Sequence, residues 1–455
     1  MKGDRSLTAN SQFTTLNSQL PKGYKQTEVG VIPEDWNALP LIECSGKITD
    51  GEHITPQREI DGYYLLSARN IQNGYIDLSD VDYVGLDEYL RIRKRCNPEP
   101  EDVLISCSGT IGRVTIVPHG LECVMVRSAA LIKPGTNRFS GRYIQYALQA
   151  PEGQKQIFSS LNQGAQANLF LNHIEKLCIP VPPTIAEQNL IARALSDTDA
   201  LIESLEQLLA KKRQIKQGAM QELLTGKRRV QGFETGKGHK QTELGMIPED
   251  WIVNPLGKIL SFKNGLNKAK EFFGFGTPIV NYMDVFNHNG LMHEYLKGKV
   301  YVTPEEIQNY SAKAGDVFFT RTSETVEEIG LSAVLLEDVK DAVFSGFVLR
   351  GRLMNNILNT SFMQYCFLSE VVRKQIKSTS SYTTRALTNG TLLSKVVLAF
   401  PSTIAEQQAI ATILSDMDLE IGAIETKLTK ARQLKQGMMH ELLTGKIRLI
   451  DKGNT

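Results

Sequence analysis

The chain has 455 residues, 41% of them hydrophobic and 22% charged, which is enough for roughly two to four domains that each bury a core. Its 51 basic and 50 acidic side chains nearly cancel, so any contact with nucleic acid must depend on local patches or on partner subunits. No uninterrupted apolar run of about eighteen residues occurs, which excludes a transmembrane helix. The six cysteines lack a CxxC pair, which indicates a reducing, cytoplasmic environment and argues against disulfides or a zinc site.

Self-similarity is the strongest signal along the chain. After a polar stretch over residues 1–21, which we interpret as a flexible leader, Lys22–Trp36 returns as Lys237–Trp251. A longer segment, Thr184–Lys227, returns as Thr403–Lys446 with roughly six positions in ten identical. The residues between these matched segments cannot be aligned by eye. A repeated frame with two different fillings suits two different ligands.

The repeated segment from Thr184 to Thr225 is predicted to be a long helix. Thr184 supplies the start, Glu187 lies in the first turn, and Gly226 ends the helix. Apolar residues at alternating steps of three and four predict a coiled-coil seam. In the first copy these are Ile191, Leu195, Ile202, Leu205, Leu209, Ile215, Ala219 and Leu223, and in the second Ile410, Leu414, Met417, Ile421, Ile424, Leu428, Ala431, Leu434, Met438 and Leu442. We expect the two helices to pair with each other, each about 60 Å long.

The fillings are predicted to be mixed α/β. Alternating apolar residues over 102–112 and 315–324 predict strands that end in turns, each followed by a second apolar run. Helical patterns near 143–161 and 362–376 precede the polar loops 162–168 and 378–389.

On these motifs the chain resembles the specificity subunit of Type I restriction–modification systems, over essentially all of residues 22–448. The resemblance implies an α+β architecture with an internal pseudo-two-fold repeat: two mixed α/β target-recognition domains joined by two long antiparallel coiled-coil helices. The expected parts are a leader (1–21), domain 1 (22–181), helix 1 (182–226), a linker (227–238), domain 2 (239–400), helix 2 (401–445) and a tail (446–455).

The resemblance also implies a non-catalytic role. Each domain would read one half of an asymmetric bipartite DNA target, while the helices set the spacer and dock two methyltransferase subunits, to which two restriction subunits add. S-adenosylmethionine, ATP and Mg²⁺ would then bind only to those partners, and this chain would hold no cofactor and no metal. Two other classes stay open: a coiled-coil scaffold for proteins, and a self-contained DNA modification enzyme.

Several short motifs resemble functional sites, but their sequence context favours ordinary turns and loops. Phe272–Gly276 fits the FxGxG loop of methyltransferases, but its charged and Pro-containing flanks indicate a plain turn. Asn97–Pro100 lacks the aromatic residue that would hold a flipped base, and Gly232–Lys237 is one residue short of a phosphate-binding loop. His288 and His293 are expected to be loop residues. No nucleophile–base pair can be nominated.

Candidate DNA contacts lie in loops rich in hydroxyl, amide and basic side chains. They follow the two predicted strands, occupy the polar loops, or form a basic patch that could track a phosphate backbone. Ordinary turns would account for the same residue types. In the first half they are Ser106, Ser108, Thr110, Arg113, Gln163, Gln166 and Asn168; in the second half they are Lys263, Asn264, Lys268, Lys270, Thr320, Arg321, Thr322, Ser323, Thr383, Thr384, Arg385 and Asn389.

Two other basic runs are less specific. Lys211–Arg213 with Lys216 is expected to lie on the solvated face of the first long helix. The run from Arg91 to Arg95 is open to either interpretation.

Overall fold

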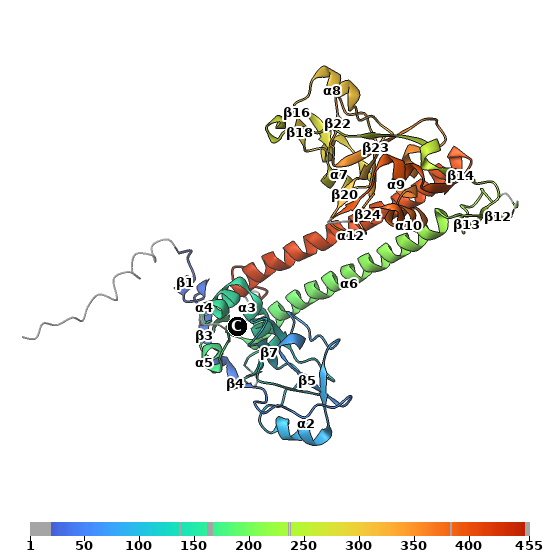
Figure 1. Ribbon diagram of the computed structural model, residues 1–455. Coiled ribbons are helices and arrows are strands. Elements are labelled where there is room, and N and C mark those ends of the chain that lie inside the picture. The colour runs from blue at the N-terminus through green and yellow to red at the C-terminus, as the bar shows by residue number, and fades with distance from the viewer. Residues whose placement is uncertain are drawn as a thin grey trace, which may run out of the picture. The chain divides into compact units, whose positions relative to one another are not determined.

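The computed structural model describes residues 20–135, 138–161, 167–234, 236, 238–382 and 385–450. This part of the chain forms two compact units. Unit 1 takes the residues up to Leu205 and those from Lys427 onward, and unit 2 takes Glu206–Thr426. Each unit holds a globular domain and one part of each of two long helices, α6 (Ile185–Leu223) and α12 (Ile404–Leu443) (Figure 1).

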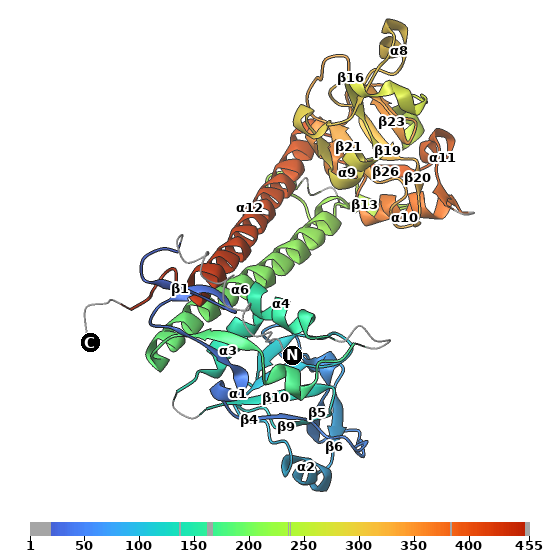
Figure 2. The same cartoon turned by 90° about the vertical axis from the view of Figure 1, so that its left-hand side faces the viewer.

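In unit 1 the domain combines small sheets with short helices (Figure 2). A four-stranded sheet has the order β4-β10-β7-β8, and a three-stranded sheet has the order β6-β5-β9. The elements are β1 (Tyr24–Thr27), β2 (Gly30–Pro33), β3 (Asn37–Pro40), α1 (Leu41–Cys44), β4 (Ser45–Asp50), β5 (Tyr63–Leu66), η2 (Ala68–Asn70), β6 (Asp82–Val84), α2 (Leu86–Arg93), β7 (Val103–Ser106), β8 (Val114–Ile116), β9 (Cys123–Met125), β10 (Ala129–Pro134), α3 (Gly141–Gln149), α4 (Pro151–Ser159), α5 (Leu171–Ile174) and β11 (Cys178–Val181).

Unit 2 repeats this arrangement with additional strands and short helices. Its main sheet has the order β15-β23-β19-β21-β17, and smaller sheets have the orders β18-β16-β22 and β20-β25-β24. The elements are β12 (His239–Thr242), β13 (Gly245–Pro248), β14 (Ile252–Pro255), η3 (Leu256–Lys258), β15 (Leu260–Asn264), η4 (Lys270–Phe272), β16 (Phe273–Val280), α7 (Tyr282–Asn287), β17 (Gly290–Leu291), η5 (His293–Tyr295), β18 (Lys299–Val300), α8 (Pro304–Asn309), β19 (Val317–Thr320), β20 (Thr322–Ser323), β21 (Ser332–Leu335), β22 (Val343–Phe344), β23 (Val348–Leu353), α9 (Thr360–Cys366), α10 (Glu370–Thr379), β24 (Ser381–Tyr382), β25 (Ala386–Leu387), α11 (Gly390–Ser394) and β26 (Val397–Phe400).

The repeat is deeper in the fold than in the sequence. The order β4-β10-β7-β8 corresponds to β15-β23-β19-β21, and the parallel pair β5–β9 corresponds to β16–β22. Registers agree too: Ser106 pairs with Ala129 as Thr320 pairs with Val348. The two fillings that share little sequence are therefore the same topology, because strand order depends on apolar periodicity and turns more than on residue identity.

The repeated motifs meet in each unit and hold it together. In unit 1, Arg448 donates to both carboxylate oxygens of Glu187 and also to Asp35 at 3.0–3.1 Å. In unit 2, Arg229 donates to Glu406 at 2.5 and 2.8 Å and to Asp250 at 2.9 and 3.2 Å. The carboxylates come from the two repeated segments, and each arginine stands two residues after the second segment ends.

A glycine turn lets these segments approach closely. Gly445 has a φ of 69°, and a Cβ added there would lie 2.5 Å from Pro33. Gly226 has a φ of 72° and stands in the same relation to Pro248. Only glycine adopts this left-handed conformation at no steric cost, so it ends each long helix and brings the next segment onto a buried tryptophan, Trp36 or Trp251.

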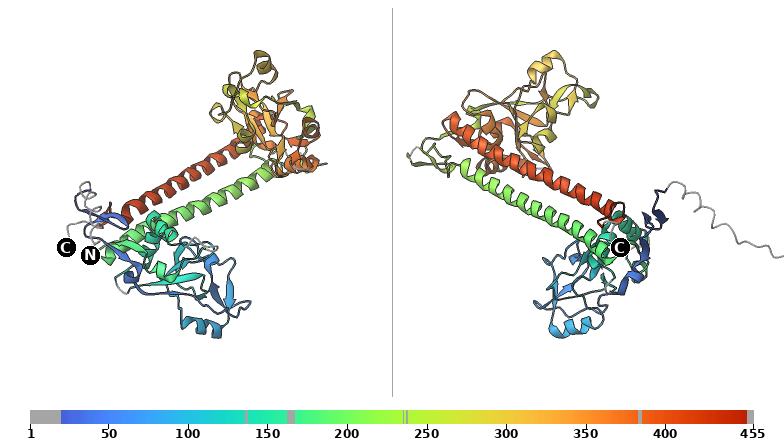
Figure 3. Two further views of the ribbon diagram at one scale, coloured as in Figure 1. Left: turned by 60° about the vertical axis from the view of Figure 1, so that its left-hand side comes forward. Right: turned by 180° about the vertical axis from the view of Figure 1, so that it is seen from behind.

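Within each unit the two long helices contact each other in antiparallel fashion. In unit 2, Lys212 pairs with Glu420 at 2.5 Å and Lys216 pairs with Asp418, so rising numbers in α6 meet falling numbers in α12. In unit 1, Lys435 of α12 pairs with Asp199 of α6 at 2.6 Å. Both helices are unbroken in the two views of Figure 3, and the predicted helices are confirmed.

Three of the predictions for these helices are wrong in detail. Ile215 and Leu434 were expected in the seam, but their side chains are 48% and 56% exposed. A spacing of 3.5 residues from Leu209 reaches positions 212 and 216 instead, so half-buried lysines occupy the seam there. The expectation of a purely solvated face for the basic run therefore fails at Lys212 and Lys216, whose ammonium groups reach carboxylates on α12.

Two further features concern single segments. The predicted turn at Phe272–Gly276 is instead the end of η4 and the irregular start of β16, where the register with β18 shifts between Phe273 and Thr277. Cross-strand pairing therefore overrides the local turn signal. Across the described residues, no helix is both long and apolar enough to span a bilayer.

Candidate nucleic-acid interface

The central strand of each domain ends at a buried hydroxyl group. The Ser106 hydroxyl, at the end of β7, donates to the carbonyl oxygen of Thr110 at 2.6 Å and accepts from the Arg113 amide at 2.9 Å. Thr320, at the end of β19, donates to the Glu328 carbonyl at 3.0 Å and accepts from the Leu331 amide at 2.9 Å. Both side chains are 0% exposed. They fix the following loops and present no hydroxyl at the surface, in contrast to the expectation that both meet DNA.

A polar pocket opens beside the end of β7 in unit 1. We call it the unit 1 pocket; it has a volume of 640 Å³. Its lining combines basic, hydroxyl and amide side chains with one carboxylate and a few apolar groups: Asp50, His53, Cys107, Ser108, Arg127, Ser128, Asn168, Leu169, Phe170, Leu171 and Asn172.

One side of the unit 1 pocket is held rigid by an ion cluster. Asp50 accepts from His53 at 2.6 Å and from Arg95 at 2.7 Å. Burial raises the pKa of Asp50, but the hydrogen bonds from Arg95 and His53 outweigh it and hold that pKa below its usual 3.8. The His53 ring is therefore fixed at the rim by an ionised carboxylate. A ligand with acceptor atoms or negative charge fits the donors in this pocket.

Unit 2 has a pocket of 380 Å³ beside the end of β19, which we call the unit 2 pocket. Its lining differs in character, because apolar and aromatic groups stand beside carboxylates: Tyr282, Met283, Phe286, Thr322, Ser323, Glu324, Glu328, Phe347 and Arg385. Tyr282 and Phe286 stack with ring centroids 5.9 Å apart. Ser323 donates its hydroxyl to a carboxylate oxygen of Glu328 at 2.9 Å.

The two pockets occupy the same place in the repeated fold. Ser108 and Thr322 both stand two residues after the buried hydroxyl, and both line their pockets. Ser128 and Phe347 both stand directly before the strand that pairs with β7 or β19, and both line their pockets as well. One edge of each domain therefore carries a hollow whose frame is repeated and whose chemistry is not.

Comparison with known proteins agrees with this duplication. A family model for the Type I restriction modification DNA specificity domain matches the chain twice, over residues 54–216 and 248–433. The chain belongs to this family. Its two matches begin in the two globular domains and continue into the long helices, so this specificity subunit has two recognition domains.

Curated relatives cover nearly the whole chain. A Methanocaldococcus jannaschii protein described as a type I restriction enzyme MjaX specificity subunit is 28% identical, covering 94% of this chain and 97% of the relative. The type I restriction enzyme EcoKI specificity subunit of Escherichia coli K12 is 24% identical, covering 92% of this chain and 90% of that protein.

A solved structure shares the fold. The S subunit of a Type I restriction–modification system from M. genitalium has a TM-score of 0.54 at 15% identity, covering 90% of this chain and 96% of that one.

The predicted contacts in recognition domain 1 fall into three groups. Ser108 and Asn168 line the unit 1 pocket. Thr110 is exposed and Arg113 is half-buried, both in the loop that Ser106 fixes. Gln163 and Gln166 lie outside the described residues.

In recognition domain 2, Thr322, Ser323 and Arg385 line the unit 2 pocket. Arg321 is half-buried beside it, with its amide donating to the Phe347 carbonyl at 3.2 Å. The Asn389 side chain accepts from the Leu392 amide and caps α11, which occupies its oxygen. Thr383 and Thr384 lie outside the described residues.

The predicted basic patch of domain 2 is only partly available to a ligand. Lys268 pairs with Glu306 at 2.7 Å and donates to the Tyr301 carbonyl at 2.9 Å, so its charge is used within the domain. Lys263 and Asn264 are exposed on β15, and Lys270 is exposed on η4.

The run Arg91–Arg95, left open by the sequence, is tied into domain 1. Arg91 pairs with Glu52 at 3.0 Å and with Glu88 at 2.7 Å, and Arg95 belongs to the Asp50 cluster. Of these two arginines, Arg95 contacts the lining of the unit 1 pocket, through Asp50 and His53.

Sequence reasoning missed the residues that give each pocket its character. Arg127 and Phe347 precede the strands β10 and β23, and Met283 and Phe286 lie on α7. No motif singles them out, because they reach the pocket only through pairing between strands far apart in the chain. No local sequence signal marks Phe347, because it stands directly before the apolar residues Val348 and Leu349.

Proposed function

We propose that this specificity subunit reads an asymmetric bipartite DNA target, with each recognition domain reading one half. The observation that carries the proposal is the pair of pockets: one edge of a repeated fold, built twice with different side chains. Two identical readers would suit a symmetric site, whereas unlike readers suit two different half-sites.

A domain exchange tests the modular part of this proposal. Residues 42–181 are replaced by the corresponding residues of another specificity subunit, and the methylated sites of a host expressing the complex are sequenced. One half-site should change while the other stays. A simultaneous change in both half-sites would contradict independent reading.

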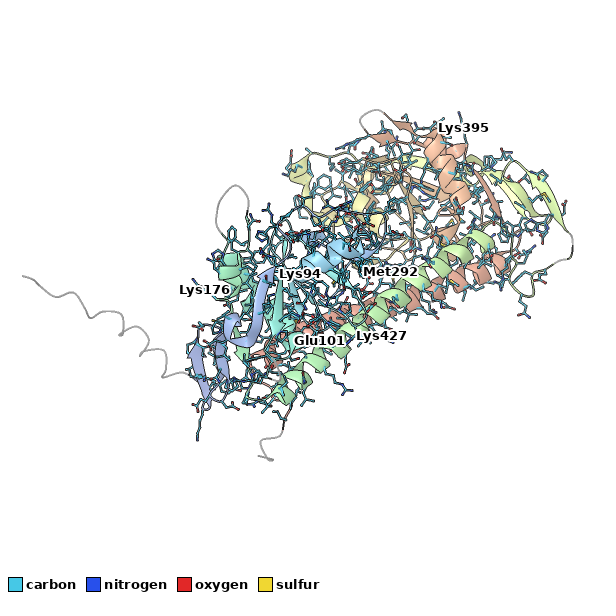
Figure 4. All side chains as sticks on the ribbon, turned by 90° about the horizontal axis from the view of Figure 1, so that it is seen from below. Lys94, Glu101, Lys176, Met292, Lys395 and Lys427 are labelled. Atoms are coloured by element: carbon cyan, nitrogen blue, oxygen red, sulfur yellow. The ribbon has the colours of Figure 1, made fainter. Side chains whose placement is uncertain are left out.

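We further propose that the long helices dock the methyltransferase subunits and set the spacer between half-sites. In unit 2, Leu208, Ile215 and Leu419 are 40%, 48% and 71% exposed on these helices. A groove of 320 Å³ that includes Ile215, Ile413 and Met417 lies between α6 and α12 in the same unit. Exposed apolar side chains beside a groove mark a site of protein–protein contact. Figure 4 shows the side chains along both helices, with Lys427 of α12 labelled.

The spacer role is tested by lengthening both helices in step. Inserting four residues after Leu209 and four at the facing position of α12 adds about one turn to each. The spacer should grow by about one to two base pairs with both half-sites intact, because the added rise of about 6 Å is slightly less than two base-pair steps of about 3.4 Å. An unchanged spacer in an active complex would contradict this role.

In this proposal the chain has no catalytic activity of its own. S-adenosylmethionine, ATP and Mg²⁺ bind to two methyltransferase and two restriction subunits, and the complex acts on DNA in the cytoplasm. The relatives named as specificity subunits of type I restriction enzymes support this division of labour. Equilibrium dialysis of the purified chain against S-adenosylmethionine should show no binding, and stoichiometric binding would favour a self-contained modification enzyme. Failure of the chain with methyltransferase subunits to protect a split DNA site would favour a scaffold.

A further inference from the structure

The unit 2 pocket exposes more apolar surface than its fold requires. Phe347, Met283 and Phe286 are 64%, 54% and 37% exposed, and all three line the same hollow. Exposed clusters of large apolar side chains mark a binding surface.

The backbone that carries these side chains is fixed in place. α7 begins with a capping box in which Asn281 and Asp284 satisfy each other's backbone amides, and its opposite face buries Val285. Phe347 follows Ser345, whose hydroxyl accepts from the Phe347 amide at 3.2 Å. The apolar cluster is therefore held ready before a ligand binds.

Unit 1 shows that the fold does not need this cluster. Its short helix η2 follows β5 as α7 follows β16, and it starts with the same kind of capping box, formed by Ser67 and Asn70. At the positions equivalent to Tyr282 and Met283, unit 1 carries Ala68 and Arg69.

At the position equivalent to Phe347, directly before β10, unit 1 carries the small residue Ser128. The same topology is built in unit 1 with small or charged residues. The apolar side chains in unit 2 are therefore explained by the ligand that the pocket binds and not by the needs of the fold.

The side chains that line the unit 2 pocket fit some chemical groups in a DNA groove and disfavour others. The only apolar group on a base edge in the major groove is the methyl group of thymine. Glu324 and Glu328 would be repelled by phosphates, whereas carboxylates accept hydrogen bonds from the amino groups of adenine or cytosine. Ser323 holds Glu328 in place at 2.9 Å, and the exposed Arg385 supplies the positive charge that offsets the two carboxylates near DNA.

We propose that the unit 2 pocket reads A·T pairs in its half-site, with Met283, Phe286 and Phe347 packing on thymine methyl groups and Glu324 or Glu328 accepting from the adenine amino group. This inference rests on the proposed function, and it adds the chemical class of the bases read. The unit 1 pocket carries Ser128 at the position equivalent to Phe347. Among its described lining residues Phe170 is the one large aromatic side chain, beside Arg127, His53 and Asn168.

Substituting uracil for thymine tests this inference, because it removes one methyl group and keeps every hydrogen-bonding group. The complex of the full chain with its methyltransferase subunits is titrated with duplexes that carry uracil in one half-site at a time. Uracil in the unit 2 half-site should weaken binding about fourfold per methyl group contacted, equivalent to ~0.8 kcal/mol. Uracil in the other half-site should weaken binding less, because the unit 1 pocket has Ser128 where the unit 2 pocket has Phe347.

A variant assigns the effect to the pocket. Phe347→Ser installs the residue that unit 1 carries, and it should reduce the difference in affinity between the thymine and uracil duplexes. Phe275→Ser is the matched control, since Phe275 is 52% exposed in the same unit but does not line the pocket; it should leave the thymine preference intact. The uracil comparison on the unaltered complex needs no variant, so a folding defect in Phe347→Ser does not remove the test.

The outcomes separate this inference from the function on which it rests. Equal binding of thymine and uracil duplexes, or a unit 2 half-site without thymine, overturns the inference while base-specific recognition stands. An equal uracil effect in both half-sites overturns it as well. If no base substitution in either half-site changes binding, the proposed function itself fails.

Discussion

Replacing Arg448 should destabilise unit 1 by about 3 kcal/mol while leaving unit 2 unaffected. The guanidinium group donates to both oxygens of Glu187, which is 0% exposed, and also to Asp35. Burial lowers the pKa of Arg448, but the hydrogen bonds that it donates to the two carboxylates outweigh this effect and raise that pKa above its usual value. Arg448 therefore stays charged, and its removal by Arg448→Met leaves Glu187 buried without a partner.

The magnitude follows from the exposure of each partner. Breaking a buried ion pair by removing one member costs about 3–5 kcal/mol. We take the lower end, because the Arg448 side chain is 18% exposed and water can reach part of the space it leaves. The contact with Asp35 adds less than about 1 kcal/mol, since that carboxylate is 54% exposed.

Hydrogen exchange of the full chain is the assay, because it reports on both units at once. In Arg448→Met the amides of β1, β2 and the start of α6 should lose protection equivalent to ~3 kcal/mol, and those of β12 and β13 should not. Arg229→Met should produce the mirror result in unit 2.

Arg228→Met is the matched control for Arg229→Met in unit 2. Arg228 is the residue next to Arg229, but its side chain is 76% exposed and lies 3.9 Å from Glu222. It should change neither unit. A loss below about 1 kcal/mol in Arg448→Met, or an equal loss in both units, would refute the assignment of this arginine to the frame of unit 1.

Three further predictions concern the surface and the pockets. Arg321→Ala should cost roughly 1–3 kcal/mol of DNA binding and relax discrimination at one position of one half-site, as measured by competition with single-base variants at two salt concentrations; an even loss across sequences would instead indicate phosphate contact. Leu434→Ser should leave the stability of the chain within about 0.5 kcal/mol, because the side chain is 56% exposed, yet weaken assembly with methyltransferase subunits in gel filtration; unchanged assembly would count against docking at this point of α12. The pKa of Asp50 lies below its usual 3.8, so its pair with Arg95 stabilises unit 1 above about pH 4, and this contribution is lost as the pH falls through the lowered pKa. Arg95→Met should therefore flatten the loss of stability in acid denaturation. An unchanged acid transition would contradict this.

The sequence by itself determined the duplication, the two long helices and their ends. Repeated motifs are visible without a structure because identity along the chain needs no tertiary contact to detect. Thr184, Gly226 and the apolar spacing act within a few residues of one another, so local rules predicted a helix whose observed bounds are Ile185–Leu223. What the motifs do was not visible, since Arg448 and Glu187 are 261 positions apart.

Tertiary structure alone decided the equivalence of the two domains and the character of their pockets. Strand pairing places Phe347 beside Met283, and Arg127 beside His53, although each pair is far apart in sequence. Packing of the two long helices placed Lys212 and Lys216 in the helix seam, where their long stems pack and their ammonium groups reach α12. Polarity alone would assign these positions to solvent. Sequence patterns report which groups are near in the chain, whereas a binding site depends on which groups the fold brings near in space.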